Sequence, residues 1–163
     1  MRPASSDFRI VLGLIGAGRT TSPWGKPRGS NPAARLGLRY ERQIKRELEH
    51  HATAGNLYHV DHNPWLTFTD TCGTSLCCPD FVIDSPLGAT VVEVKLTWVP
   101  VAAEKLRSLY CPVVSCILGD RVRSLIIVKY MAFEAPKASY SLIDALRQPE
   151  GLLHWPGNGH IPW

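Results

Sequence analysis

The sequence lacks any apolar run long enough to span a membrane, so we expect no membrane partner. Its five cysteines are an odd number, which does not suit a closed disulfide framework. Reduced thiols are typical of a cytoplasmic protein, so we expect a cytoplasmic location. The glycines Gly13, Gly16 and Gly18 stand in the wrong order for a dinucleotide fingerprint, and no Walker lysine follows them. We therefore expect no nucleotide to bind at this segment.

Length and composition indicate one compact domain, because 163 residues with 45% hydrophobic content can bury a sizeable core. The net charge is +4, and residues 1–49 alone contain ten Lys or Arg against four Asp or Glu. We expect a basic N-terminal arm or edge element over residues 1–34 and a core over residues 35–148. Residues 149–163 are expected to form a C-terminal tail that packs on the core.

Two short apolar segments separated by a turn predict a β-hairpin. Residues 80–84 and 90–98 are the strands, and the sequence between them, DSPLG, has proline and glycine where a tight turn uses them. An earlier segment, residues 63–70, is rich in aromatic and β-branched residues and is expected to be the strand before this hairpin.

Charged side chains gather on one face of this predicted hairpin. Side chains alternate between the faces of a strand, so Glu93 and Lys95 share one face and Val92 and Val94 share the other. On the partner strand, Asp80 falls on the polar face. Two carboxylates and an ammonium therefore meet at one place, where burial is costly unless each charge has a partner.

A divalent cation would be such a partner. Oxygen ligands suit Mg²⁺, for which Mn²⁺ can substitute, and the expected ligands are Asp80, Glu93 and the backbone carbonyl of Val94. Such an ion stabilises charge on a phosphate and lowers the pKa of a bound water. Lys95 is placed to orient that water or to stabilise developing negative charge. This chemistry is hydrolysis of a phosphodiester.

Upstream, residues 35–48 predict an amphipathic helix, because apolar residues recur at every fourth position. The expected buried stripe consists of Leu36, Tyr40, Ile44 and Leu48. Glu41 flanks this stripe. A basic stripe of Arg39, Arg42 and Arg46 is either a solvated helix face or a track for a phosphate backbone.

The arrangement P-D-x12-E-x-K, with the preceding helix, resembles the PD-(D/E)XK nuclease superfamily, in particular its small phage and Holliday-junction-resolvase members. The resemblance implies an α/β restriction-endonuclease-like core, a central mixed sheet with an antiparallel catalytic hairpin flanked by helices. It also implies a Mg²⁺-dependent endonuclease that acts on DNA, as a homodimer if it cuts two strands together. If the chain is phage-encoded, the expected location is the host cytoplasm. By the same resemblance, Glu41 is a further metal or water ligand. The alternative for Glu41 is a solvated glutamate paired with Lys45.

Downstream of the hairpin, residues 100–110 predict a second helix and residues 112–118 a strand, which would complete the order of the superfamily core. Exonuclease-like members carry a glutamine on this helix, and this chain has none, so Lys105 or Arg107 would contact phosphate instead. We expect Tyr110 to be a core aromatic. A further short helix is expected over residues 138–148.

Three alternatives to a DNA endonuclease remain open at this point. One is an exonuclease or nickase of the same superfamily, and another is a catalytically silent member that only binds nucleic acid. The third is a binding module held by structural zinc, since one cluster of histidines and cysteines lies before the hairpin. Its candidate ligands are His59, His62, Cys72 and Cys77 or Cys78.

Overall fold

The computed structural model describes residues 9–22 and 31–163, so expectations that concern residues 1–8 and 23–30 lie outside the described residues. The protein is an α/β fold with two sheets. The larger is a five-stranded mixed sheet in the order β2-β5-β6-β7-β8, and the smaller is a three-stranded antiparallel sheet in the order β1-β3-β4. No helix within the described ranges is long and apolar enough to cross a membrane.

The strands of the larger sheet come from both halves of the chain. They are β2 (His59–His62), β5 (Phe81–Ser85), β6 (Gly88–Thr97), β7 (Arg123–Tyr130) and β8 (Glu150–His154). The pairs β2–β5 and β5–β6 are antiparallel, whereas β6–β7 and β7–β8 are parallel. The expected tail over residues 149–163 therefore begins with an edge strand of the sheet. Its Trp155 is buried and stacks on Tyr40 with ring centroids 6.0 Å apart.

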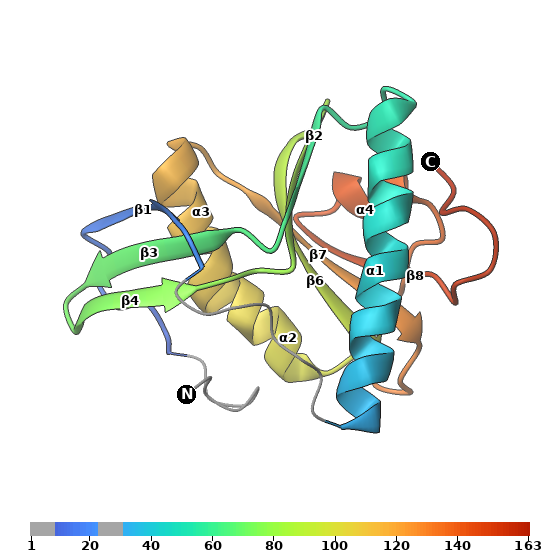
Figure 1. Cartoon of the computed structure of the whole chain (residues 1–163), viewed down its shortest axis with the longest axis horizontal. Helices are drawn as coiled ribbons and strands as arrows, with labels where there is room; N and C mark the ends of the chain where they lie inside the picture. The colour runs from blue at the N-terminus through green and yellow to red at the C-terminus, as the bar shows by residue number, and fades with distance from the viewer. Residues whose placement is uncertain (1–8, 23–30) are drawn as a thin grey trace.

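Helices cover both faces of the larger sheet (Figure 1). One face carries α1 (Pro32–Thr53) and α4 (Leu142–Arg147), and the other carries a long helix that bridges β6 and β7. That helix consists of α2 (Pro100–Lys105), a π-helical turn η1 (Leu106–Tyr110) and α3 (Cys111–Leu118). The sheet is therefore the middle layer of three.

The helix α1 forms where the sequence predicts one, and begins earlier. Asn31 is the N-cap, accepting a hydrogen bond from the Ala34 amide, and Pro32 occupies the first turn, where no amide donor is needed. Tyr40, Ile44 and Leu48 are buried against the sheet. Leu36 was expected beside them and is 56% exposed, because it lies on the first turns, beyond the tightly packed part of the core.

The predicted strand over residues 112–118 is wrong, because this segment is α3. Pro112 has no amide to donate to the Ser108 carbonyl, and that carbonyl instead accepts a hydrogen bond from the Val11 amide at 3.1 Å. The wider η1 turn, closed by the Cys111 amide on the Leu106 carbonyl, carries the helix past the proline ring. The strand that follows the helix is β7, further along the chain.

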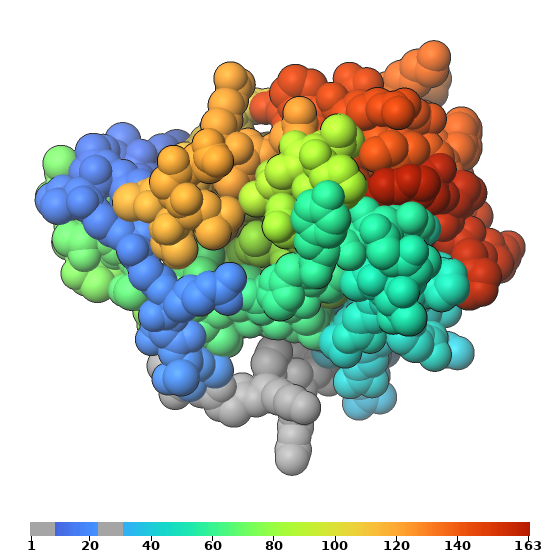
Figure 2. Space-filling model, turned by 90° about the horizontal axis from the view of Figure 1, so that it is seen from above, coloured from blue at the N-terminus to red at the C-terminus, as the bar shows by residue number. Residues whose placement is uncertain are grey.

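The smaller sheet consists of β1 (Gly16–Thr20), β3 (Trp65–Asp70) and β4 (Gly73–Cys77). The predicted strand over residues 63–70 is therefore a strand, but it pairs with β1 and β4, while β2 is the neighbour of the hairpin strand β5. Figures 1 and 2 place this sheet at one end of the molecule and α1 with the C-terminal segment at the other.

The β3–β4 segment leaves the larger sheet and returns to it at neighbouring positions. His62 at the end of β2 is the register partner of Phe81 at the start of β5. Between them, the Asn63 amide donates a hydrogen bond of 2.8 Å to the Asp80 carbonyl, with Asn63 in the left-handed region at φ 52°. This backbone bond closes the base of the excursion.

Candidate functional site

The predicted hairpin is present and has the predicted faces. Phe81 pairs with Val92, and both side chains are fully buried in the layer beneath α1. In the turn, the Ser85 hydroxyl accepts the Leu87 amide at 3.1 Å and donates to the Gly88 carbonyl at 3.2 Å, while Gly88 takes a positive φ of 97°. The pairing of Phe81 with Val92 places Asp80 across from Glu93.

The Asp80 side chain accepts a hydrogen bond from a β6 amide, in the place where a backbone carbonyl would accept it within a sheet. Its Oδ2 accepts the Val94 amide at 2.7 Å, one residue before β5 begins. The carbonyl of a strand residue points to the same side as its amide, so the Val94 carbonyl faces the same gap. Burial, together with the charges of Glu93 and Glu41, raises the pKa of Asp80 to about 8.

Glu93 is the most deeply buried charged side chain of the site, with 1% of its surface exposed. Its Oε1 accepts hydrogen bonds from Lys95 Nζ at 2.7 Å and Lys105 Nζ at 3.3 Å. Its Oε2 is buried and has no hydrogen-bond partner among the described residues. A buried carboxylate oxygen without a partner is costly, so this atom is suited to a ligand that brings positive charge.

Lys95 remains a cation in this setting. Burial alone would lower the pKa of its ammonium, but the carboxylates of Glu93, Asp80 and Glu41 outweigh burial, and the pKa is raised. At neutral pH, Lys95 therefore donates hydrogen bonds and does not act as a proton acceptor.

Glu41 reaches the site from α1 and is held by residues at the end of β2. Its Oε1 lies 2.8 Å from His62 Nε2 and 3.1 Å from Asn63 Nδ2. Its side chain is only 15% exposed, and Lys45 forms an ion pair of 2.6 Å with Glu49. The alternative of a solvated Glu41 does not describe this position, because the side chain packs toward the sheet.

Two residues of the long helix complete the site. Lys105 was expected to contact phosphate, and here its ammonium bonds Glu93 and lies 4.6 Å from the ring centroid of Tyr110. Tyr110 is buried, as expected for a core aromatic, and its hydroxyl donates to the Cys78 carbonyl at 3.0 Å. Burial, followed by the nearby Glu93 and Asp80, raises the pKa of Tyr110, so the hydroxyl stays protonated. Arg107 lies apart, paired with Glu150 and Glu104.

The structure thus brings together Asp80, Glu93, Lys95, Glu41 and Lys105. It does not add Arg107, and the basic stripe of Arg39, Arg42 and Arg46 lies exposed along α1, outside the carboxylate cluster. His62 and Asn63 were not expected as partners of Glu41. Only their position at the end of β2, beside the hairpin, could have indicated this role. The sequence analysis instead expected residues 63–70 to form the strand before the hairpin.

The side chains fit a magnesium site of low ligand count. Within the described part of the chain, no three His, Cys, Asp or Glu side chains group so as to hold a metal ion by themselves. Mg²⁺ commonly needs only one or two carboxylates, with water and substrate phosphate completing its shell. The unpaired Glu93 Oε2 and the crowding of negative charge around Asp80 both suit such an ion. The zinc candidates are scattered: Cys72 and His59 are exposed, and His62 stacks on Phe81.

Comparison with protein families, with curated proteins and with solved structures found no match to this chain.

Proposed function

We propose that this protein is a metal-dependent nuclease that hydrolyses phosphodiester bonds of DNA, built on a PD-(D/E)XK-type core. The observation that carries the proposal is that Asp80 and Glu93 each lie next to the paired Phe81 and Val92 of the hairpin, with Glu93 Oε2 buried and unpartnered among the described residues. The order of helix α1, hairpin β5–β6, long helix and parallel strand β7 agrees with the core that the resemblance implies.

In this proposal, Asp80, Glu93 and the Val94 carbonyl hold Mg²⁺, and Glu41 is near enough to act on the same site, since its charge raises the pKa of Asp80. When bound, the ion supplies charge neutralisation at the phosphate and an acidified water. Lys95, kept protonated by its neighbours, donates to the attacking water or to the phosphate oxygen as negative charge develops. Lys105 provides a second ammonium on the same carboxylate.

Positively charged side chains outside the cluster supply the expected contact with the backbone of DNA. Arg39, Arg42 and Arg46 are all exposed on α1, the helix that carries Glu41. Contacts of this kind give affinity that depends on salt and tolerates changes of sequence. A dimer, which we also propose for cutting both strands, would place two such helices on one duplex.

Cleavage of end-labelled substrates tests the proposal. A four-way junction, a linear duplex and a nicked circle are incubated with Mg²⁺ or with EDTA, using the wild type, Lys95→Ala and Glu93→Gln. Lys137→Ala and Glu104→Gln are the controls, because both residues are exposed and lie outside the cluster.

We expect the wild type to cleave DNA with Mg²⁺ and not with EDTA. The cleavage rate should fall at least about 100-fold in both site variants and stay unchanged in the controls, since a positioned charge at the reacting group commonly supplies that factor. The preferred substrate would separate resolvase, exonuclease and nickase activities. Tight DNA binding without cutting, unchanged by Lys95→Ala, would contradict the proposal in favour of a silent binding protein.

A further inference from the structure

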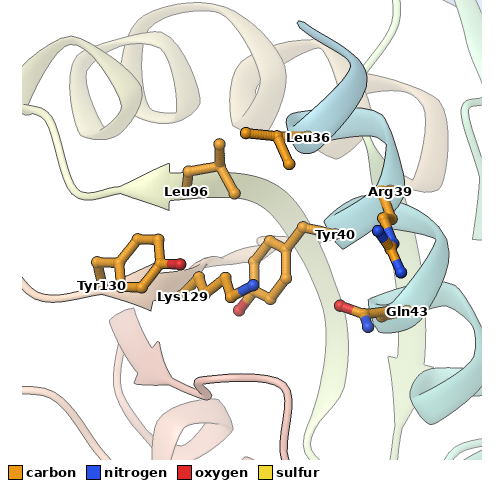
Figure 3. Close-up of a pocket in the computed structure, with 7 residues that line it drawn as sticks. All are labelled: Leu36, Arg39, Tyr40, Gln43, Leu96, Lys129 and Tyr130. Carbon is orange, nitrogen blue, oxygen red and sulfur yellow. The ribbon is translucent and has the colours of Figure 1, made fainter. Parts of the chain in front are cut away.

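A cavity of about 310 Å³ lies on the α1 side of the larger sheet (Figure 3). It opens between the first turns of α1 and the carboxyl ends of β6 and β7. Its lining residues are Leu36, Arg39, Tyr40, Gln43, Leu96, Lys129 and Tyr130. None of the residues of the carboxylate cluster lines it. The cavity is therefore separate from the carboxylate cluster, although both lie toward the same end of β6.

The polar groups of this cavity are suited to an anion. Arg39 and Lys129 contribute two positive charges, and Gln43 contributes an amide, whereas the seven lining residues include no Asp or Glu. Within the described part of the chain, neither Arg39 nor Lys129 forms an ion pair. Two unpaired cations at one concave place favour a phosphate, which accepts several charge-assisted hydrogen bonds.

Aromatic and aliphatic side chains form the remaining walls. The Lys129 ammonium lies 6.0 Å from the ring centroid of Tyr40 and 5.5 Å from that of Tyr130, so it extends between the two rings (Figure 3). Tyr130 is 54% exposed, so part of its ring is open to solvent beside the cations. An aromatic face beside a phosphate site is the combination on which a nucleic-acid base stacks.

The size and place of the cavity limit the ligand. Ligand pockets begin at about 300 Å³, so this cavity accommodates one small molecule or one unit of a polymer. In α/β sheets, ligands bind beyond the carboxyl ends of parallel strands, and β6 and β7 are parallel here.

We propose that this cavity is a nucleotide subsite, which takes one nucleotide with its phosphate on Arg39 and Lys129 and its base against Tyr130. The inference rests on the proposed function in one respect: the nucleotide is taken to be part of the DNA strand that the enzyme cleaves. A nucleotide within a DNA strand and a free nucleotide share the same chemistry, a base and a phosphate on one sugar. The experiment distinguishes these two ligands.

Isothermal titration calorimetry in EDTA measures binding without cleavage. The probes are dAMP, deoxyadenosine, inorganic phosphate and a 5′-phosphorylated oligonucleotide of four adenines. The proteins are the wild type, Arg39→Gln, Lys129→Gln, Tyr130→Ala and the control Lys45→Gln, which removes the same charge from α1 outside the cavity. Thermal unfolding of each variant verifies that it is folded.

We expect dAMP to bind at least about ten-fold more tightly than either deoxyadenosine or phosphate alone, because both parts of the ligand contribute. Each cavity variant should weaken dAMP binding by about ten-fold or more, and Lys45→Gln by less than two-fold. If the oligonucleotide displaces dAMP, the subsite takes a strand unit; if it does not, the subsite takes free nucleotides.

Equal affinity for dAMP and phosphate, or equal weakening by Lys45→Gln, would overturn the nucleotide subsite. Failure of the subsite is distinguishable from failure of the nuclease. Cleavage without dAMP binding removes the subsite and leaves the nuclease, whereas dAMP binding without cleavage supports the subsite and removes the nuclease.

Discussion

Replacing Asp80 by asparagine is expected to stabilise the metal-free protein at alkaline pH. Asp80 ionises in the folded protein at a pKa of about 8, against its ordinary value of 3.8, because it is buried beside Glu93 and Glu41. The folded state therefore keeps this proton to higher pH than the unfolded state does. The contribution of Asp80 to the free energy of unfolding is therefore highest below about pH 4, falls as the pH rises toward 8, and is level above it.

The size of the effect follows from this shift of the pKa. Each pH unit between the two pKa values costs about 1.4 kcal/mol, which sets an upper limit of about 5 kcal/mol at pH 8. Relaxation of the side chains and entry of water reduce this cost, so we expect Asp80→Asn to gain at least about 2 kcal/mol at pH 8 and little at pH 4. Asparagine keeps an oxygen that can accept the Val94 amide, as Asp80 does at 2.7 Å.

Urea unfolding followed by tryptophan fluorescence, at pH 4 and pH 8 in EDTA, measures this difference. Asp84→Asn is the control, because it removes an exposed carboxylate from the same strand and should change stability by less than about 0.5 kcal/mol. Adding Mg²⁺ at ten times its dissociation constant should stabilise the wild type by about 1.4 kcal/mol and leave Asp80→Asn unchanged. An Asp80→Asn variant that is less stable than the wild type at pH 8 would refute the reasoning.

Three further predictions concern packing, a buried hydrogen bond and affinity for DNA. Gly151→Ala should lower the free energy of unfolding in urea by about 3 kcal/mol, since the added methyl group would lie 2.3 Å from a backbone carbonyl oxygen of α4. Gly37→Ala has open space at its position on α1 and should raise that free energy by about 1 kcal/mol, so equal effects of the two variants would contradict this reasoning. Tyr40→Phe should cost about 1 kcal/mol in the same assay, because it removes a buried hydrogen bond of 2.7 Å to a backbone carbonyl, and an unchanged midpoint would count against that bond. Replacing Arg42 and Arg46 together by glutamine should lower the slope of DNA affinity against salt concentration by about 2, as measured by fluorescence anisotropy, and an unchanged slope would remove both residues from the interface.

The hairpin and the first helix were predictable because their information is local. A period of two residues fixes the faces of β6, and a proline and a glycine mark the turn before it. The burial of Tyr40, Ile44 and Leu48 follows from their spacing of four residues. The carboxylates Asp80 and Glu93 meet because this local pattern also sets the register of the hairpin.

The error at residues 112–118 has a physical cause outside the local sequence. The apolar run from Pro112 to Leu118 satisfies a buried strand and a buried helix equally well, and a proline normally argues against a helix interior. Here the lost bond is compensated by Val11, a residue far away in the chain, and by the π-helical turn. Neither compensation can be inferred from the residues beside the proline.

The partners of Glu41 were also beyond local reasoning. His62 and Asn63 contact it because β2, and not β3, lies beside β5. The choice between these two strands depends on how the chain between them folds into a second sheet. Long-range pairing of this kind is set by the packing of the whole domain.

The excursion through β3 and β4 has a consequence for which changes of chain length the site tolerates. His62 and Phe81 are register partners, and the bond from the Asn63 amide to the Asp80 carbonyl closes the loop at its base. Insertions or deletions at the exposed turn between β3 and β4 would leave the anchoring of Asp80 in place. The bond at the base thus separates the placement of Asp80 from the length of the β3–β4 turn, so that turn can change length without moving the carboxylate.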